Sequence, residues 1–272
     1  MPYQAKNGTL AMAGRSMDYI SFGGGDRPLI MLPGLSDGLK TVKGAAAPFA
    51  WMYRAFAKEH KVYVLSRINQ LAEGYTTGDM ARDTALAMDA LGLASARVYG
   101  VSQGGMIAQR LALDYPERVE RLALAVTASR SNPMLTAAVT RWICMAQQGD
   151  YKGLMVDTAE SSYSDAYMRT HRWLFPLLGS IGGPKEPSRF ILQAQACLSH
   201  DAYARLPELR CPTLILGGGA DRIVGPQASK ELAERIPGSE LYIYQGLGHA
   251  AYEEAGDFNS RVLRFLEGAA RG

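Results

Sequence analysis

The chain has 272 residues, 47% of them hydrophobic, and its 29 basic and 26 acidic side chains leave a net charge of +3. This length and apolar content favour one α/β domain with an insertion, built around a large buried core. The charges are interspersed, which does not indicate a nucleic-acid partner, and no apolar run is long enough to predict a membrane span.

Two further features bear on where the protein works. The first eight residues lack the apolar stretch of a secretory signal. Cys144, Cys197 and Cys211 fit neither a disulfide framework nor a metal-binding spacing, so we expect three structural thiols. We therefore expect the protein to be located in the cytoplasm.

Short apolar runs alternate along the chain with longer amphipathic segments, as β-strands alternate with α-helices. We predict strands at 10–13, 16–22, 28–32, 62–65, 98–101, 119–126, 213–217 and 240–244. We predict helices at 48–60, from a cap at 77–79 to about 92, and at 106–114, 227–236 and 257–268. The first two strands form an edge hairpin, and the later alternation predicts right-handed crossovers in a mostly parallel sheet.

The alternation stops after Ala128 and resumes only near Thr213. The intervening segment contains helix-like stretches rich in Trp, Tyr, Met and Phe, and about 75 residues are too many for a structureless loop. We expect residues 130–205 to form a helical cap over the carboxyl edge of the sheet, where open α/β sheets bind ligands. The core would then comprise residues 1–129 and 206–272.

A candidate nucleophile lies in the run Gly100-Val101-Ser102-Gln103-Gly104-Gly105-Met106, between a predicted strand and an Ala-rich helix. The Gly-x-Ser-x-Gly spacing is typical of a nucleophile elbow, a strained turn that lifts a serine hydroxyl off the end of a strand. Glycines leave room for the two backbones to approach each other. The alternative is an ordinary glycine-rich turn, so the catalytic interpretation needs a base and an acid nearby.

The chain offers four histidines as the base. We expect His60 to be solvated at a helix end, and His171 and His200 to have surface or packing roles in the cap. His249 follows the last predicted strand in a glycine-rich loop, which places it at the same sheet edge as Ser102. His249 is therefore the candidate general base.

The candidate acid is Asp221, which directly follows the strand at 213–216. Its expected role is to fix the tautomer of His249 and to stabilise the imidazolium. The alternatives are an ordinary turn or a partner for Arg222. The segment 127–135 contains no carboxylate that could replace it.

Negative charge that develops on a carbonyl oxygen requires backbone N–H donors. We expect the amide of Gln103, directly after the nucleophile, and the amide of Leu35, beside Gly34, to form this oxyanion hole. Within the cap, Trp142, Met145, Tyr163 and Trp173 are candidates for an apolar acyl or aryl pocket, with packing between cap helices as the equal alternative.

Together these motifs resemble the α/β-hydrolase fold family, in its esterase, lactonase and C–C hydrolase branch. The resemblance rests on Pro33-Gly34, the segment 100–105, the segment 220–224 and Gly248-His249, in the family's order. It covers nearly the whole chain except the variable cap. It implies a mostly parallel eight-stranded sheet with helices on both faces, an inserted helical cap and a Ser-His-Asp triad.

Two departures from the family pattern affect the rim of the expected pocket. Pro33-Gly34 replaces the usual His-Gly, so a histidine that often supports the oxyanion loop is absent. Residues 66–70, Ser-Arg-Ile-Asn-Gln, replace the usual Asp-x-Arg-Gly-x-Gly loop.

The expected function is hydrolysis of a small or medium carboxylic ester through an acyl-enzyme on Ser102. The resemblance leaves open a lactonase, a C–C bond hydrolase, a cofactor-free perhydrolase or haloperoxidase, and an acyltransferase on the same triad. A non-catalytic ligand receptor is the remaining class. We expect no metal, because Glu253-Glu254 near His249 does not have the spacing of a zinc site. We expect no nucleotide or flavin cofactor, because the chain has no Gly-x-Gly-x-x-Gly motif. The oligomeric state is left open.

Overall fold

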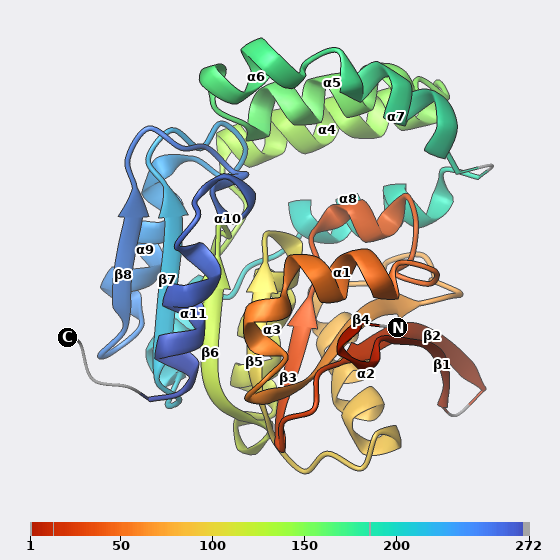
Figure 1. The fold of residues 1–272 in the computed structure, drawn as a ribbon. Helices are drawn as coiled ribbons and strands as arrows, with labels where there is room; N and C mark the ends of the chain where they lie inside the picture. The colour runs from red at the N-terminus through yellow and green to blue at the C-terminus, as the bar shows by residue number, and fades with distance from the viewer. Residues whose placement is uncertain (1, 13, 185, 269–272) are drawn as a thin grey trace.

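The computed structural model describes residues 2–12, 14–184 and 186–268, so Ala13, the last residue of the first predicted strand, lies outside them. The described chain forms an eight-stranded sheet in the order β1-β2-β4-β3-β5-β6-β7-β8 (Figure 1). The strands are β1 (Lys6–Met12), β2 (Arg15–Phe22), β3 (Arg27–Leu32), β4 (His60–Ile68), β5 (Ala96–Val101), β6 (Val119–Ala125), β7 (Thr213–Gly218) and β8 (Glu240–Tyr244). β1 and β2 form the antiparallel edge hairpin, and β3 to β8 run parallel to one another. This confirms the predicted fold class.

Helices cover both faces of the sheet because successive side chains of each central strand point to opposite faces. In β3, Ile30 and Leu32 belong to one apolar cluster, while Leu29 and Met31 belong to the other. The first cluster packs against α2 (Thr77–Ala90), α3 (Gln103–Asp114) and α9 (Pro226–Arg235). The second packs against α1 (Ala46–Met52) and α11 (Phe258–Leu266), and the short helix α10 (Ala251–Glu254) follows the last strand (Figure 1).

Four helices of the described ranges begin beside a side chain that accepts a hydrogen bond from a free amide. Thr76 caps α2, one residue before the predicted position, and completes a capping box with Asp79. Asn132 accepts a hydrogen bond from the Leu135 amide at the start of α4 (Pro133–Gln147), where Pro133 occupies the first helical position.

A run of helices lies between β6 and β7 in the sequence. They are α4 (Pro133–Gln147), α5 (Tyr151–Ser162), α6 (Asp165–His171), α7 (Leu174–Gly182) and α8 (Ser188–Leu198), called the inserted helices below. In Figure 1, α4 to α7 form a layer beyond the carboxyl ends of the parallel strands, and α8 lies between that layer and the sheet. The inserted helices therefore lie on the side of the sheet at which the parallel strands end.

The predicted helix at 48–60 is too long. α1 ends at Met52, a 3-10 turn occupies Arg54–Phe56, and His60 already begins β4. Tyr53 leaves the helical conformation, with φ −102° and ψ 23°, and both Tyr53 and Phe56 pack into the core. A helix that continued to residue 60 would remove the pairing of Arg27 with His60 between β3 and β4.

His60 is fully buried rather than solvated as predicted. Its ring contacts Phe56 edge-on, with ring centroids 6.3 Å apart. Burial, together with the nearby charge of Arg97, lowers the pKa of His60 to about 4. The side chain is therefore a neutral member of the core.

The loop predicted from Ser66 onward begins later, because β4 continues through Ile68. Ile68 pairs with Met17 of β2, and the Ser66 hydroxyl accepts a hydrogen bond from the Val42 amide at 3.0 Å. These partners lie far away in sequence, which is why the local pattern does not reveal them. None of the helices in the described ranges is both long and apolar enough to cross a membrane.

Candidate active site

Ser102 stands at the turn between β5 and α3 with φ 53° and ψ −119°, a conformation that L residues rarely adopt. The backbones around it leave no space for side chains. A Cβ on Gly100 would lie 2.4 Å from the Gly104 carbonyl oxygen, and one on Gly104 would lie 1.9 Å from the Leu32 carbonyl oxygen. The glycine spacing is thus required for the strand and helix to meet at this angle.

A second strained residue supports the turn from the neighbouring strand. Val126, directly after β6, has φ 45°, an outlier for a β-branched side chain. It is followed by Thr127, whose hydroxyl donates a hydrogen bond to the Ser102 carbonyl oxygen at 2.7 Å. A Cβ on Gly105 would lie 2.6 Å from Thr127, so the elbow and this residue are packed tightly. Sequence reasoning missed both Val126 and Thr127.

The structure brings together Ser102, His249 and Asp221, the three residues selected from the sequence. Nε2 of His249 lies 2.9 Å from Oγ of Ser102, and Nδ1 of His249 lies 2.8 Å from Oδ2 of Asp221. His249 and Asp221 are buried, and Ser102 is half-buried. The first distance allows a proton to pass from Ser102 to His249, and the second allows the carboxylate to orient the ring.

Asp221 is held as an anion by its surroundings. Its second oxygen, Oδ1, accepts hydrogen bonds from the amides of Ile223 at 2.8 Å and Val224 at 3.0 Å. Burial alone would raise the pKa of Asp221, but the charge of His249, its hydrogen bond and the two amides together lower it below the ordinary value. The carboxylate can therefore stabilise a positive charge on His249.

The loop that carries His249 is fixed against the inserted helices. The Ala250 amide donates to the Ser162 carbonyl oxygen, at the end of α5, at 2.9 Å. A Cβ on Gly248 would lie 2.5 Å from that same oxygen, and a Cβ on Gly218 would lie 2.1 Å from the Gly248 carbonyl. The position of the histidine therefore depends on the inserted segment as well as on β7.

The two predicted oxyanion amides begin helical turns. Leu35 is the first residue of a 3-10 turn (Leu35–Gly38), and Gln103 is the first residue of α3. Amides at such positions have no acceptor within the helix, and neither has a hydrogen-bond partner among the described residues. A Cβ on Gly34 would lie 3.4 Å from Cβ of Ser102, so this loop faces the serine.

A buried arginine lies between the oxyanion loop and the elbow. Nη2 of Arg67 donates to the Pro33 carbonyl oxygen at 2.6 Å and to Oε1 of Gln103 at 2.8 Å, and the Arg67 amide donates to Asp37 at 3.1 Å. Arg67 is only 3% exposed, and burial lowers its pKa. It stands in the 66–70 segment, whose departure from the family pattern was the one sequence signal for it.

Helix α8 completes this polar cluster from the other side. Nε2 of Gln103 donates to the Gln193 carbonyl oxygen at 2.7 Å and contacts the Cys197 sulfur at 3.2 Å. Arg189 forms a 2.7 Å ion pair with Asp37, which also accepts from the Gln193 side chain. Cys197 is buried, and burial raises its pKa to about 12, so it is a neutral structural thiol.

Two cavities are lined by residues next to the triad, Val101 in one and Ala250 in the other, although Ser102 itself lines neither. One, of about 250 Å³, lies on the sheet side. It is lined by Met31, Leu32, Pro33, Gly34, Ser36, Phe49, Met52, Tyr53, Val64, Tyr99, Val101, Tyr252 and Glu253. The other, of about 240 Å³, lies between the core and the inserted helices. It is lined by Leu35, Ser36, Leu39, Trp142, Leu154, Met155, Thr158, Ala159, Ser162, Tyr163, Phe175, Phe190, Ala250, Tyr252 and Glu253. We call them the sheet-side and helix-side cavities.

The four pocket residues selected from the sequence divide into two pairs. Trp142 and Tyr163 line the helix-side cavity. Trp173 does not, because it is 67% exposed and its indole N–H donates to the Thr170 carbonyl oxygen at 3.1 Å. Met145 packs against a neighbouring apolar cluster and does not line either cavity.

The remaining histidines serve other purposes. His200 is buried, as a packing role requires, and its Nδ1 lies 2.9 Å from the Thr77 hydroxyl. His171 is exposed and stacks on Tyr167, with ring centroids 4.0 Å apart. Across the described ranges, no three His, Cys, Asp or Glu side chains are grouped so that they could hold a metal ion.

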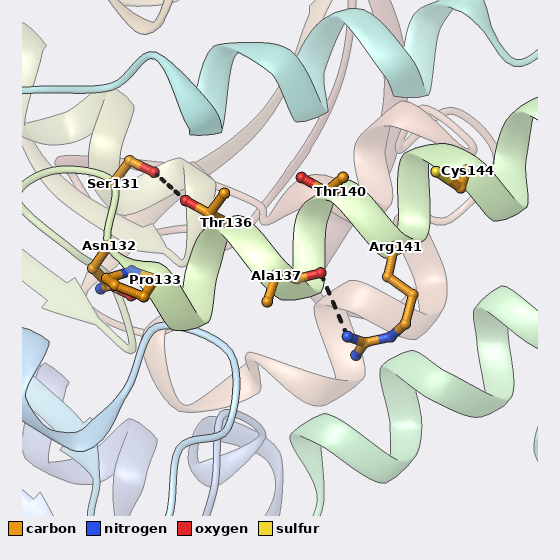
Figure 2. A pocket seen from close by; sticks show the side chains of 8 residues that line it. All are labelled: Ser131, Asn132, Pro133, Thr136, Ala137, Thr140, Arg141 and Cys144. Atoms are coloured by element: carbon orange, nitrogen blue, oxygen red, sulfur yellow. Dashed lines mark hydrogen bonds between the residues drawn. The ribbon is translucent and has the colours of Figure 1, made fainter.

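A separate shallow groove of about 860 Å³ runs along α4 (Figure 2). It is lined by Ser131, Asn132, Pro133, Thr136, Ala137, Thr140, Arg141 and Cys144. None of these residues belongs to the two cavities beside Ser102. The groove is therefore distinct from the candidate site.

Comparisons with known proteins agree with this architecture. The sequence matches the α/β hydrolase fold family over residues 28–180 and the serine aminopeptidase S33 family over residues 185–256. It is 30% identical over 212 residues to "Putative carbamate hydrolase RutD" of Caulobacter sp. (strain K31), covering 74% of this chain and 76% of that protein. It is also 30% identical over 191 residues to a 2-hydroxy-6-oxononadienedioate/2-hydroxy-6-oxononatrienedioate hydrolase of Pseudomonas sp. The match covers 66% of this chain and 65% of that protein. Among solved structures, the enol-lactonase of Burkholderia xenovorans LB400 has a similar fold, with a TM-score of 0.81 and 22% sequence identity. The superposition covers 96% of this chain and 100% of the enol-lactonase chain.

Proposed function

The chain belongs to the α/β-hydrolase fold family, and on this premise we propose that it is a serine hydrolase acting on a small or medium carboxylic ester. The observation that carries the proposal is the hydrogen-bonded chain from Ser102 Oγ through the His249 ring to the Asp221 carboxylate. A serine becomes nucleophilic when a base within hydrogen-bond reach can accept its proton.

In the proposed reaction, Oγ of Ser102 attacks the ester carbonyl carbon while its proton moves to Nε2 of His249. The negative charge on the former carbonyl oxygen is stabilised by the amides of Leu35 and Gln103, and Asp221 stabilises the imidazolium. Collapse of the tetrahedral intermediate expels the alcohol, which takes the proton from His249. Water then attacks the acyl carbon as it gives a proton to Nε2 of His249. Collapse of this second tetrahedral intermediate releases the acid, and Oγ of Ser102 takes the proton back from His249.

We also propose that residues 130–205 act as a cap over a core formed by residues 1–129 and 206–272. Support comes from the helix-side cavity, whose wall combines Leu35 of the core with Trp142 and Phe175 of the inserted helices. An acyl or alcohol group bound there would be removed from bulk water, which strengthens the electrostatic interactions at the carbonyl.

A carbamate is the second candidate substrate class, favoured by the 30% identity to a protein named as a carbamate hydrolase. Its carbonyl can be attacked by the same serine, with an amine or alcohol as the leaving group. Parallel assays with an ester and a carbamate that share one leaving group would rank the two classes by kcat/KM.

The proposal is tested with short-chain p-nitrophenyl esters, assayed on the wild type and on Ser102→Ala. We expect the Ser102→Ala rate to fall to the uncatalysed level while the melting temperature stays close to that of the wild type. Ser95→Ala is the matched control, because Ser95 precedes the same strand at its opposite end and is bonded to Glu120. Equal rates for wild type and Ser102→Ala would refute the proposed function.

A further inference from the structure

The walls of the two cavities beside Ser102 carry one formal charge. Among the residues that line the sheet-side and helix-side cavities, Glu253 is the ionisable acid, and no Lys, Arg or His lines either of them. Glu253 lines both cavities, together with Ser36 and Tyr252. A substrate that extends from Ser102 into either cavity therefore meets the same carboxylate.

Glu253 is placed there by α10, four residues after His249. One of its oxygens, Oε2, accepts a hydrogen bond from the Tyr163 hydroxyl, which comes from the inserted helices. The carboxylate has no ion-pair partner among the described side chains. Its negative charge is therefore not neutralised by a neighbouring cation.

The other polar side chains that line the two cavities are uncharged and include several tyrosine hydroxyls. Tyr53 and Tyr99 line the sheet-side cavity, and the Tyr99 hydroxyl is buried without a hydrogen-bond partner in the described structure. Burial, reinforced by the charge of Glu253, raises the pKa of Tyr53, Tyr163 and Tyr252. These hydroxyls remain neutral donors at physiological pH and supply no cation to bind an anionic group.

We propose that Glu253 sets the charge preference of the site, so that it accepts acyl substrates with a neutral or cationic non-reacting part and rejects those that carry a carboxylate. This inference rests on the proposed function. A carboxylate in either cavity would lose hydration and meet a like charge, whereas a quaternary ammonium would meet Glu253 and the faces of aromatic rings. Because Glu253 is exposed to solvent, which screens its charge, we expect an effect of about tenfold rather than several orders of magnitude.

The experiment compares three acetate esters of nearly equal shape. Their alcohols are choline (cationic), 3,3-dimethylbutan-1-ol (neutral) and 4-hydroxy-2,2-dimethylbutanoate (anionic). In the wild type we expect kcat/KM for the anionic ester to be about tenfold below that for the neutral ester, and kcat/KM for the cationic ester to equal or exceed that for the neutral ester.

Two variants assign the preference to one side chain. Glu253→Gln keeps the shape and removes the charge, and we expect it to raise the anionic-to-neutral ratio of kcat/KM about tenfold and to lower the cationic-to-neutral ratio. Glu234→Gln, on the exposed face of α9, removes the same formal charge far from the cavities and should leave both ratios at their wild-type values. Equal kcat/KM values for the three esters in the wild type would overturn the inference. So would equal shifts of the two kcat/KM ratios in Glu253→Gln and Glu234→Gln.

A binding measurement separates this inference from the proposed function. Calorimetric titration of Ser102→Ala with the same three esters reports affinity without turnover. If the wild type hydrolyses none of the esters but the variant binds them in the expected order, the reaction assignment fails and the charge preference stands. If hydrolysis depends on Ser102 but the anionic ester binds as tightly as the neutral one, the charge preference is wrong and the reaction assignment stands.

Discussion

Nη2 of the buried Arg67 lies 2.8 Å from Oε1 of Gln103, and the same nitrogen lies 2.6 Å from the Pro33 carbonyl oxygen. Gln103 and the segment after Pro33 carry the two amides proposed to bind the oxyanion. One guanidinium thus joins the two halves of the proposed oxyanion hole. The guanidinium comes from the end of β4.

Replacing Arg67 with methionine should therefore weaken catalysis and stability together. We expect kcat on a short-chain ester to fall about tenfold or more, with a smaller change in KM, because the amides bind the transition state more strongly than the substrate. The free energy of unfolding should fall by about 1.5–3 kcal/mol through loss of charged hydrogen bonds. Arg67→Lys, which keeps the charge but not the forked donors, should give intermediate values. An unchanged kcat in Arg67→Met would show that the arginine does not position the oxyanion hole.

Asp221→Asn should leave the fold intact and remove most of the activity. The amide can still accept from Ile223 and Val224, but it favours the wrong tautomer of His249 and gives no charge to stabilise the imidazolium. We expect kcat to fall by a factor on the order of 10³–10⁴, as for the corresponding change in a serine protease. Steady-state kinetics and a thermal melt check this, and a fall of less than tenfold would contradict the role of Asp221.

Acid should destabilise the protein through its buried histidines. Burial and nearby arginines lower the pKa of His60 to about 4 and of His200 to about 3, below about 6.5 in the unfolded chain. As pH falls from about 6.5 towards these values, only the unfolded state binds the protons, so the free energy of unfolding decreases. Each histidine contributes a slope of about 1.4 kcal/mol per pH unit.

The variant His200→Gln should reduce this slope by about 1.4 kcal/mol per pH unit between pH 4 and 6. The exposed His171 provides the control, since His171→Gln should leave the slope unchanged. Urea unfolding at several pH values measures both. Identical slopes for wild type and His200→Gln would contradict the neutral, buried state of His200.

Substitution of a glycine in the elbow by alanine should be far more damaging than the same substitution at a glycine with free space around it. Gly104→Ala brings a Cβ to 1.9 Å from the Leu32 carbonyl oxygen, whereas Gly256→Ala meets nothing within 4 Å. We expect Gly104→Ala to cost about 3 kcal/mol or more and to abolish activity, because the backbone must move. Gly256→Ala should change stability by less than about 1 kcal/mol. Comparable melting temperatures for the two variants would mean that the elbow is packed more loosely than described.

The parts of the site that the sequence reveals are those encoded locally. The elbow around Ser102, the Asp221 turn and the His249 loop each combine an apolar strand with nearby glycines, and parallel strands bring their carboxyl ends to one edge. The eight strands are readable for the same reason, since apolar runs bounded by glycine and proline have a local signature.

The parts that the sequence does not reveal depend on distant partners. Arg189 and Asp37 are 152 positions apart, and the buried state of His60 depends on strand pairing rather than on its neighbours in sequence. Trp142 and Met145 look alike in sequence, but only Trp142 lines the helix-side cavity, because this depends on which face of α4 is turned towards the core.

The most direct test of the account is covalent labelling with a fluorophosphonate probe followed by peptide mapping. We predict a single adduct on Ser102, no adduct in Ser102→Ala, and slower labelling in Asp221→Asn, because His249 must accept the serine proton for attack on phosphorus. The absence of labelling in the folded wild type, or an adduct on another residue that persists in Ser102→Ala, would contradict the central claim that Ser102 is the nucleophile.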